Sequence, residues 1–465
     1  MSRGVFRGNN YKPKIWSFDT NDTVFSPQVR MSGSSLRRPL WKLPNNEYFG
    51  VEDLTYTFPN STGKTVNLEM NSYDMVNFIS LVTDGLTGRL DLTPFNNLYW
   101  IETRACSSLT GVTLPYCNQN ISVVDFRLCN LTGTLDLRPL GDKLGSFIRV
   151  GDNPNLTKIL HSGSTRVFTY YDVSGADLTG VHDVSMLPHQ NGLFLIGSNN
   201  NLTGITLSPN TGYTITNFSM GNTNLDGELD LTGMSIRGAI SFSFTSNLTN
   251  IKFATPSDIG DVSGVWTSFL SQGGGIIGLD LSSFIQLGGQ FTVTGCASLT
   301  GITHTASTEV FTQYRCYDND LTGTHDISML TGLGGDLLMY RTPSLTDVLF
   351  PLTTETFGDT FFNAIEIWDC DLGYVNFLPL SGASINGGNN TIELQDNNMT
   401  AAEVNQILVD FDNLSSNLNP YGWTGLTLDI SGTNSKPDAS SGGYNGIAAV
   451  DSLTGATNQW TVTTT

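Results

Sequence analysis

Hydrophobic residues return in this chain at a short, nearly fixed interval through most of its length. From Leu86 to Leu248 the repeated segments start 22 to 25 residues apart, and a shorter form such as LTGVTL at 109–114 alternates with a longer one. An interval of this size is typical of a solenoid, in which each repeat packs only against its neighbours. The longer form reads LTGRLDL, LTGTLDL, LTGVHDV, LDGELDL and LTGTHDI at residues 86–92, 131–137, 178–184, 225–231 and 321–327.

The residues before each repeated segment alternate between apolar and polar side chains. Examples are VDFRLCNL at 124–131 and IRVGDNPNL at 148–156. This alternation predicts a short strand with one face in the core. An Asn or a Cys follows at a fixed place, where a small side chain suits a turn with buried backbone groups.

This combination of strand, Asn or Cys position and following leucine resembles the leucine-rich-repeat family over about residues 70–430. The resemblance implies a mainly β solenoid of about 23-residue repeats, with parallel strands, few helices and a role in protein or surface recognition. We expect a basic extended N-terminal arm and cap at residues 1–70, the solenoid at 71–430 and a C-terminal cap at 431–465. Near that end, the apolar spacing of residues 401–411 predicts a helix.

Charge is unevenly distributed along the chain. Residues 1–50 carry a net charge of +5, whereas the remaining residues carry −25. The body therefore repels nucleic acid and anionic membranes, while the arm suits an acidic partner. We find no apolar run long enough for a signal peptide or a membrane span, so we expect synthesis in a host cytoplasm. The basic residues of the expected docking arm are Arg3, Arg7, Lys12, Lys14, Arg30, Arg37, Arg38 and Lys42.

One aspartate recurs on alternate repeats and is the first candidate for chemistry. Consecutive copies are expected about 9–10 Å apart, which is loose for a pair of catalytic carboxylates. Repetition also argues against catalysis, because an acid and a base need unlike environments. We therefore expect a solvated or turn-bonding role for Asp91, Asp136, Asp183, Asp230, Asp280 and Asp326.

The histidines and cysteines also favour structural roles. His182 and His325 occupy a place that is filled by leucine in other repeats, and they lie too far apart to share a metal ion. No CxxC spacing is present. We predict no catalytic, cofactor-binding or metal-binding residues and no cofactor. Four cysteines, Cys106, Cys129, Cys296 and Cys370, lie on or beside the position of the recurring Asn.

The outward strand positions form the candidate binding face. They are chemically mixed and contain no run of aromatic residues. Tyrosines gather only at Tyr170 and Tyr171 and at Tyr314 and Tyr317, and we expect these rings to belong to the core rather than to a ligand site. The charged members of the candidate face are Glu102, Asp125, Arg149, Asp172, Arg315 and Glu366.

A basic arm on an acidic repetitive body resembles the layout of bacteriophage virion proteins. Our first hypothesis is a non-catalytic tail-fibre, tail-associated or capsid-decorating protein, located in the virion and held to other virion proteins by its arm. We expect an oligomeric assembly, with a host-surface protein or glycan as a further partner. One alternative is a bacterial surface or injection-system adhesin. Another is a tail-spike polysaccharide depolymerase on a β-helix, with acidic residues near the irregular segment 254–275, which we interpret as an inserted loop.

Overall fold

In the computed structural model the chain forms two compact units, Met1–Ser208 and Pro209–Thr465. The protein is mainly β, with a parallel β-solenoid of about 11 turns of ~23 residues and few helices. This confirms the β-solenoid that the repeat predicted. The structure describes residues 14–21, 24–25, 27–31, 40–44, 48–50, 56–57, 63–70, 72–82, 85–164, 166–187, 189–207, 214–232, 235–253, 266–282, 287–306, 311–330, 333–352, 361–382, 384–385, 391–415 and 424–465.

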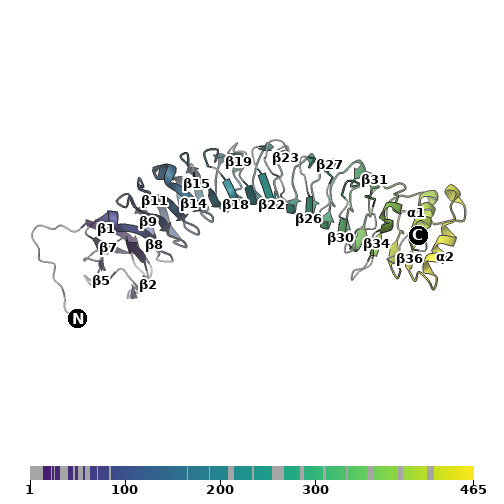
Figure 1. The fold of residues 1–465 in the computed structure, drawn as a ribbon, viewed down its shortest axis with the longest axis horizontal. Coiled ribbons are helices and arrows are strands. Elements are labelled where there is room, and N and C mark those ends of the chain that lie inside the picture. Colours follow the sequence, from purple (N-terminus) through teal and green to yellow (C-terminus); the bar gives the residue numbers. More distant parts are fainter. Residues whose placement is uncertain are drawn as a thin grey trace, which may run out of the picture. The chain divides into compact units, whose positions relative to one another are not determined.

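The first unit is built on a sheet of parallel strands, one from each solenoid turn (Figure 1). Paired positions such as Val124, Ile148, Tyr171 and Phe194 are fully buried, so one face of this sheet forms the core. The strands in order are β8 (Val76–Ser80), β10 (Trp100–Glu102), β12 (Ile121–Asp125), β14 (Leu144–Arg149), β16 (Phe168–Asp172) and β18 (His189–Leu195).

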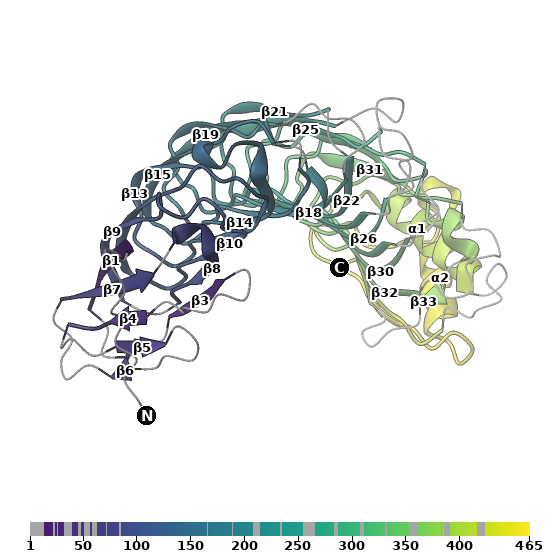
Figure 2. The ribbon, with the colours of Figure 1, turned by 60° about the vertical axis from the view of Figure 1, so that its left-hand side comes forward.

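A second series of strands lies on the opposite side of the first unit (Figure 2). The first two of these strands belong to a six-stranded sheet, and the others form two-stranded sheets. Leucines from this side close the core against the main sheet; Leu90 and Leu135, for example, are buried. The pairs are β9 (Leu86–Asp91) with β11 (Ser108–Thr113), β13 (Thr132–Asp136) with β15 (Asn155–Leu160), and β17 (Gly180–Asp183) with β19 (Leu202–Thr206). The 3-10 helix η2 (Arg138–Lys143) follows β13.

Several strands lie in the region where we expected an extended arm. Strand β1 pairs antiparallel with β7 and β9, and β3 pairs antiparallel with β8 at the first edge of the main sheet. The expected boundary at residue 70 stays a prediction. These elements are β1 (Lys14–Thr20), β2 (Val24–Phe25), β3 (Gln28–Met31), β4 (Leu40–Lys42), β5 (Tyr48–Gly50), β6 (Tyr56–Thr57), β7 (Lys64–Met70) and the 3-10 helix η1 (Tyr73–Met75).

The second unit repeats the same plan, with a parallel main sheet and paired strands opposite it. The main sheet contains β20 (Thr214–Ser219), β22 (Ser235–Ser241), β24 (Trp266–Gln272), β26 (Leu287–Thr294), β28 (Phe311–Arg315), β30 (Leu333–Leu338), β32 (Phe361–Glu366), β33 (Ser384–Ile385), β34 (Thr391–Glu393), β35 (Thr427–Asp429) and β36 (Thr461–Thr463). The opposite pairs are β21 (Gly227–Leu231) with β23 (Leu248–Phe253), β25 (Gly278–Asp280) with β27 (Gly301–Thr303), and β29 (Gly323–Asp326) with β31 (Leu345–Leu349). Of the irregular segment 254–275, residues 254–265 lie outside the described part of the chain.

Two helices lie near the C-terminal end of the second unit. The predicted helix is confirmed as α1 (Ala401–Asn413), and Thr400 with Glu403 forms a capping box at its start. A second helix, α2 (Gly446–Thr454), packs against α1 and was not predicted. Two 3-10 helices, η3 (Leu378–Gly382) and η5 (Ser441–Gly443), also lie in this unit.

Asparagine and cysteine side chains hold the turns that follow the main-sheet strands. The amide of Asn153 accepts a hydrogen bond from the Leu131 N–H at 3.0 Å and donates to the carbonyls of Phe126, Val150 and Gly151. At the equivalent place, the Cys129 thiol donates to the Thr103 carbonyl at 2.8 Å. These side chains satisfy backbone groups that burial removes from water.

Candidate functional site

The predicted binding-face residues of the first unit stand in register on one sheet. Strand pairing places Glu102 beside Asp125, Asp125 beside Arg149, and Arg149 beside Asp172. The four side chains therefore form one row, with neighbouring strands about 4.8 Å apart. The predicted alternation thus assigned all four residues to the same row.

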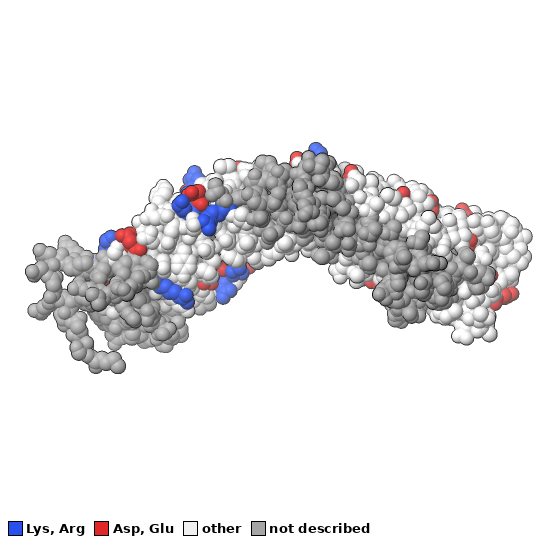
Figure 3. Space-filling view, in the orientation of Figure 1, with Lys and Arg blue, Asp and Glu red and all other residues white. Residues whose placement is uncertain are grey.

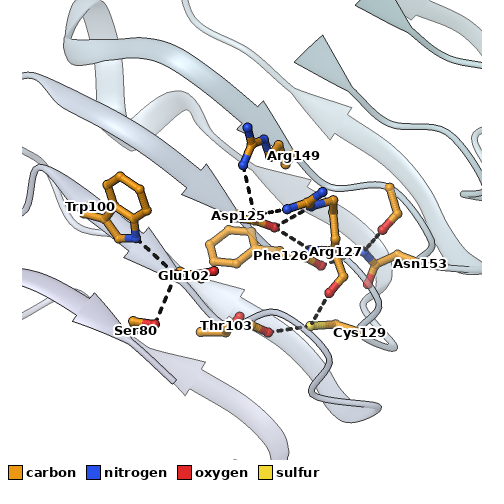
Figure 4. A network of polar contacts seen from close by, with 11 residues as sticks. Ser80, Trp100, Glu102, Thr103, Asp125, Phe126, Arg127, Cys129, Arg149 and Asn153 are labelled. Atoms are coloured by element: carbon orange, nitrogen blue, oxygen red, sulfur yellow. Dashed lines mark hydrogen bonds and ion pairs between the residues drawn. The ribbon is translucent and has the colours of Figure 1, made fainter. Parts of the chain in front are cut away.

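Asp125 is the centre of an ion network in this row (Figure 4). Its side chain is only 2% exposed, and its carboxylate meets the Arg127 guanidinium at 2.6 Å and that of Arg149 at 3.7 Å. The hydrogen bond to Asp125 raises the pKa of Arg127, which burial alone would lower. Two cations thus compensate one nearly buried carboxylate, while Nε of Arg149 is buried without a hydrogen-bond partner among the described residues.

The other members of the row also have internal partners. The Arg149 guanidinium lies over the rings of Phe147 and Tyr170, at 4.9 and 4.6 Å from their centroids. Glu102 accepts hydrogen bonds from Ser80 at 3.1 Å and from the Trp100 indole at 3.3 Å (Figure 4). Contacts within the chain therefore hold these side chains in place.

In the second unit, Arg315 and Glu366 occupy one row with Leu338 between them. Arg315 forms an ion pair with Asp336 at 2.9 Å. Glu366 lies beside Glu393 on an adjacent strand. Burial raises the pKa of Glu366, and repulsion from Glu393 is the second cause of this rise. Like charges on adjacent strands destabilise a sheet, so this pair is a place where a cationic partner group would stabilise the fold.

A column of stacked aromatic rings lies two residues beyond this row. Tyr317 and Tyr340 stack with centroids 4.5 Å apart and planes at 11°, and Tyr340 and Trp368 stack at 4.5 Å and 7°. The Arg341 guanidinium lies 5.1 Å from the Tyr340 centroid and 5.7 Å from that of Trp368. We call Tyr317, Tyr340 and Trp368 the aromatic column; its side chains are half-buried.

Sequence reasoning missed this column, and it assigned two tyrosines wrongly. Tyr171 and Tyr314 are fully buried, as expected, whereas Tyr170 and Tyr317 are half-exposed. Tyr314 lies within β28 and points into the core, whereas Tyr317 lies two residues beyond the end of that strand. The signal that identifies the column is the aromatic residue that recurs two positions after the row residue in three successive turns.

The recurring aspartates bond to turns, as predicted. Asp91, for example, accepts a hydrogen bond from the backbone N–H of Thr93 at 2.9 Å, two residues further on. This local bond gives the recurring residue a structural role in each turn. Asp136, Asp183, Asp230, Asp280 and Asp326 make the same bond to Arg138, Ser185, Thr232, Ser282 and Ser328, each at 2.9 Å.

Two polar networks lie in the core, one in each unit; His182 and His325 are buried, and His161 and His304 are half-buried. The Tyr171 hydroxyl lies 2.9 Å from Nε2 of His161 and 2.6 Å from Nε2 of His182. The Tyr314 hydroxyl lies 2.7 Å from Nε2 of both His304 and His325. This arrangement supports the structural role predicted for His182 and His325, and each has a tyrosine partner that the sequence did not indicate.

An open pocket of about 250 Å³ lies next to the first network. Its lining includes both histidines together with Lys158, Asp183 and the exposed Met186. Protonation of such histidines requires water at the site, and the pocket brings solvent to the edge of an otherwise buried network.

The basic residues of the predicted docking arm divide into two groups. Lys14 lies over the Tyr73 ring at 5.2 Å, Arg30 lies over the Phe78 ring at 4.6 Å, and Lys42 is 3.9 Å from Glu69. These three residues are thus engaged within the first unit. Arg3, Arg7, Lys12, Arg37 and Arg38 lie outside the described residues.

In the described part of the chain, no group of three His, Cys, Asp or Glu side chains is placed to hold a metal ion. Its six cysteines are free thiols, and burial raises the pKa of Cys117 to about 12. Within the same residues we find no helix with the length and apolar character that crossing a bilayer requires. Comparison with protein families, curated proteins and solved structures gave no match.

Proposed function

We propose that this chain is a non-catalytic structural and binding protein of a bacteriophage virion, namely a tail fibre, a tail-associated protein or a capsid decoration. Its basic N-terminal segment anchors it to other virion proteins, and its solenoid faces a protein or glycan of the host surface. The resemblance to leucine-rich repeats supports the recognition role, and the charge asymmetry of +5 against −25 supports the anchoring role.

The proposal that the chain is non-catalytic is supported mainly by the hydrogen bonds that its ionisable side chains make within the fold. The six recurring aspartates bond to turns, and the buried histidines bond to tyrosines. A catalytic acid or base needs an unsaturated position facing a substrate. The chain instead offers rows of pre-ordered side chains, and most of the described surface in Figure 3 belongs to uncharged residues.

The contact surface in this proposal is the outward face of the main sheets. Glu102 and Arg149, the latter held by the nearly buried Asp125, serve the first unit, and the aromatic column serves the second. Tyr, Trp and Arg are enriched at the centres of protein interfaces, because they bury large areas at low entropy cost. Both surfaces combine these residue types.

The anchoring role is tested by co-sedimentation of the full chain with phage particles that lack it. A variant with Arg3, Arg7 and Lys12 changed to Gln removes three positive charges, and Arg3→Lys with Arg7→Lys is the matched control. We expect binding that weakens with salt, is lost in the Gln variant and persists in the Lys variant. Failure of the full chain to bind any particle would overturn the virion assignment and favour a surface adhesin.

The depolymerase alternative has a separate test. Incubation of the full chain with capsular polysaccharide is expected to leave the viscosity of the solution unchanged. A fall in viscosity that continues with time would contradict the non-catalytic assignment, whatever the outcome of the particle experiment.

A further inference from the structure

The two polar networks are copies of one arrangement. His304, Tyr314 and His325 follow His161, Tyr171 and His182 at a constant distance of 143 residues. The surrounding sequence repeats as well, with LTGVHDVSML at 178–187 and LTGTHDISML at 321–330. Each set places two imidazole rings 5.7 Å apart on either side of one phenol hydroxyl.

Each network joins the two sides of its unit through the core. Tyr171 belongs to β16 of the main sheet, whereas His161 follows β15 and His182 belongs to β17 on the opposite side. Other turns have apolar residues at all three places. Leu114 stands where His161 does, Ile148 pairs with Tyr171, and Leu135 corresponds to His182. Among the equivalent positions compared, only these turns have hydrogen bonds where the other turns have hydrophobic contacts.

The hydrogen bonds of each network depend on how many protons its two imidazoles carry. A phenol hydroxyl has one proton to donate, so one neutral imidazole accepts it at Nε2 while the other donates its own Nε2 proton. When both imidazoles are protonated, both donate to the same oxygen and the phenol proton loses its acceptor. Two positive charges then face each other in a core of low dielectric.

Within the described residues, the charged groups nearest these histidines are carboxylates that bond to turns and one lysine. In the first unit Asp183 is adjacent to His182, but its carboxylate already accepts from Ser185, and Lys158 of β15 lines the same pocket. Phe194 of β18 stacks on Tyr171 at 5.2 Å. In the second unit Asp326 is adjacent to His325 and bonds to Ser328, while Phe291 of β26 stacks on Tyr314 at 4.8 Å and the Cys316 thiol is buried nearby.

We propose that each His–Tyr–His network is an acid-sensitive latch, which ties the two sides of its unit together at neutral pH and releases β17 or β29 when the histidines take up protons. The pocket beside His161 and His182 supplies the water through which the first latch is protonated. Release exposes apolar residues such as Leu178 and Leu187, which are buried in the closed state.

The pKa values of the histidines are shifted in the direction that this latch requires. Burial lowers the pKa of His182 and of His325 to about 4, and that of His304 to about 3. The closed latch therefore resists protonation, and the released state takes up protons first. Each histidine has a lower pKa in the closed latch than in the released state. As the pH falls from the higher to the lower of these two values, the population of the released state rises by up to tenfold per pH unit for each histidine that titrates.

Hydrogen exchange of the full chain at pH 7 and pH 4.5, corrected for intrinsic rates, tests the latch. We expect segments 178–187 and 321–330 to lose at least tenfold in protection, and segments 131–137 and 225–231, which carry leucine at this place, to keep theirs. The variant His161→Leu/Tyr171→Phe/His182→Leu is expected to abolish the loss in 178–187 and to leave the loss in 321–330 unchanged.

The same substitutions in the second network, His304→Leu/Tyr314→Phe/His325→Leu, give the reciprocal variant if the first one fails to fold. Each variant keeps one intact network as its internal reference. Equal protection at both pH values in the unmodified chain would overturn the proposal. A loss in 178–187 that survives the substitution would overturn it as well.

Discussion

The guanidinium of Arg341 and the carboxylate of Asp318 meet at two points across adjacent turns, with Nε–Oδ1 at 2.5 Å and Nη2–Oδ2 at 2.6 Å. The same guanidinium lies over Tyr340 and Trp368. The ion pair with Asp318 therefore holds Arg341 against the aromatic column. The side chains of Arg341 and Asp318 are 46% and 39% exposed, in contrast to the 2% of Asp125. This difference in exposure separates a surface feature from a structural one.

Replacing Asp125 by Ala is expected to lower the free energy of unfolding by about 3 kcal/mol, because Arg127 and Arg149 lose a nearly buried counter-charge. Asp318→Ala is the matched change at an exposed pair and is expected to cost about 1 kcal/mol or less. Urea unfolding at pH 7, followed by far-UV circular dichroism, measures both. Equal losses in the two variants would show that burial does not govern these pairs.

Asn153→Ala is expected to destabilise the first unit by about 2–4 kcal/mol, because it leaves several buried backbone groups without a partner. Asn153→Cys is expected to cost less, since the Cys129 thiol bonds to a backbone carbonyl at the same position of its own turn. The same urea experiment compares them. Asn155→Ala removes an exposed amide nearby and serves as the control; if it matches Asn153→Ala, the explanation is wrong.

Acid is expected to destabilise the protein through its buried histidines. Their folded-state pKa values, about 4 for His182 and His325 and about 3 for His304, lie below the usual value near 6.5. The unfolded chain therefore binds more protons in this window. The stabilisation is complete above about pH 6.5 and is lost as the pH falls towards about 4, by roughly 3 kcal/mol for each histidine.

Thermal unfolding between pH 7 and pH 4 measures this loss. Carboxylates titrate over part of the same range, so the unmodified chain is compared with the variant His161→Leu/Tyr171→Phe/His182→Leu, which keeps every carboxylate. The Tm of this variant is expected to fall less steeply with acid than that of the unmodified chain. Parallel curves would contradict the assignment of the effect to the first network.

Trp368→Ala and Tyr340→Ala are each expected to weaken binding of the full chain to its partner surface by about tenfold or more, because central aromatic residues dominate interface energies. Tyr116→Ala removes a ring that is 81% exposed in the first unit and is the control. Titration of particles or host cells with labelled protein gives the affinities. Unchanged affinity in both column variants would remove the aromatic column from the contact surface.

The sequence predicted the fold well where one repeat determines one feature. The alternation around Asp125 and Arg149 identified residues that strand pairing places in one row, although Asp125 is buried where an outward position was expected. The spacing of residues 401–411 identified helix α1. Helix α2 was missed because its nine residues follow a polar stretch rich in Gly and Ser, which indicated no regular structure. Short helices depend on tertiary packing more than on local propensity.

Features that join several turns were not predicted. Tyr317, Tyr340 and Trp368 are separated by 23 and 28 residues, so only the register of the strands reveals that they stack. The partners in each His–Tyr–His network lie 10 and 11 residues apart on different segments. Whether these His and Tyr side chains come into contact depends on the width of the core, which cannot be read from a local sequence pattern.

The register of the main sheet has a consequence for how this surface changes during evolution. Each point of the outward row comes from a separate turn, and its side chain takes no part in the backbone pairing between strands. Substitution of Glu102, or of Arg315 in the second unit, therefore alters one point of the surface while the ladder of strands persists. Under the proposed function, a single substitution in this row would change what the surface contacts and leave the pairing of the strands intact.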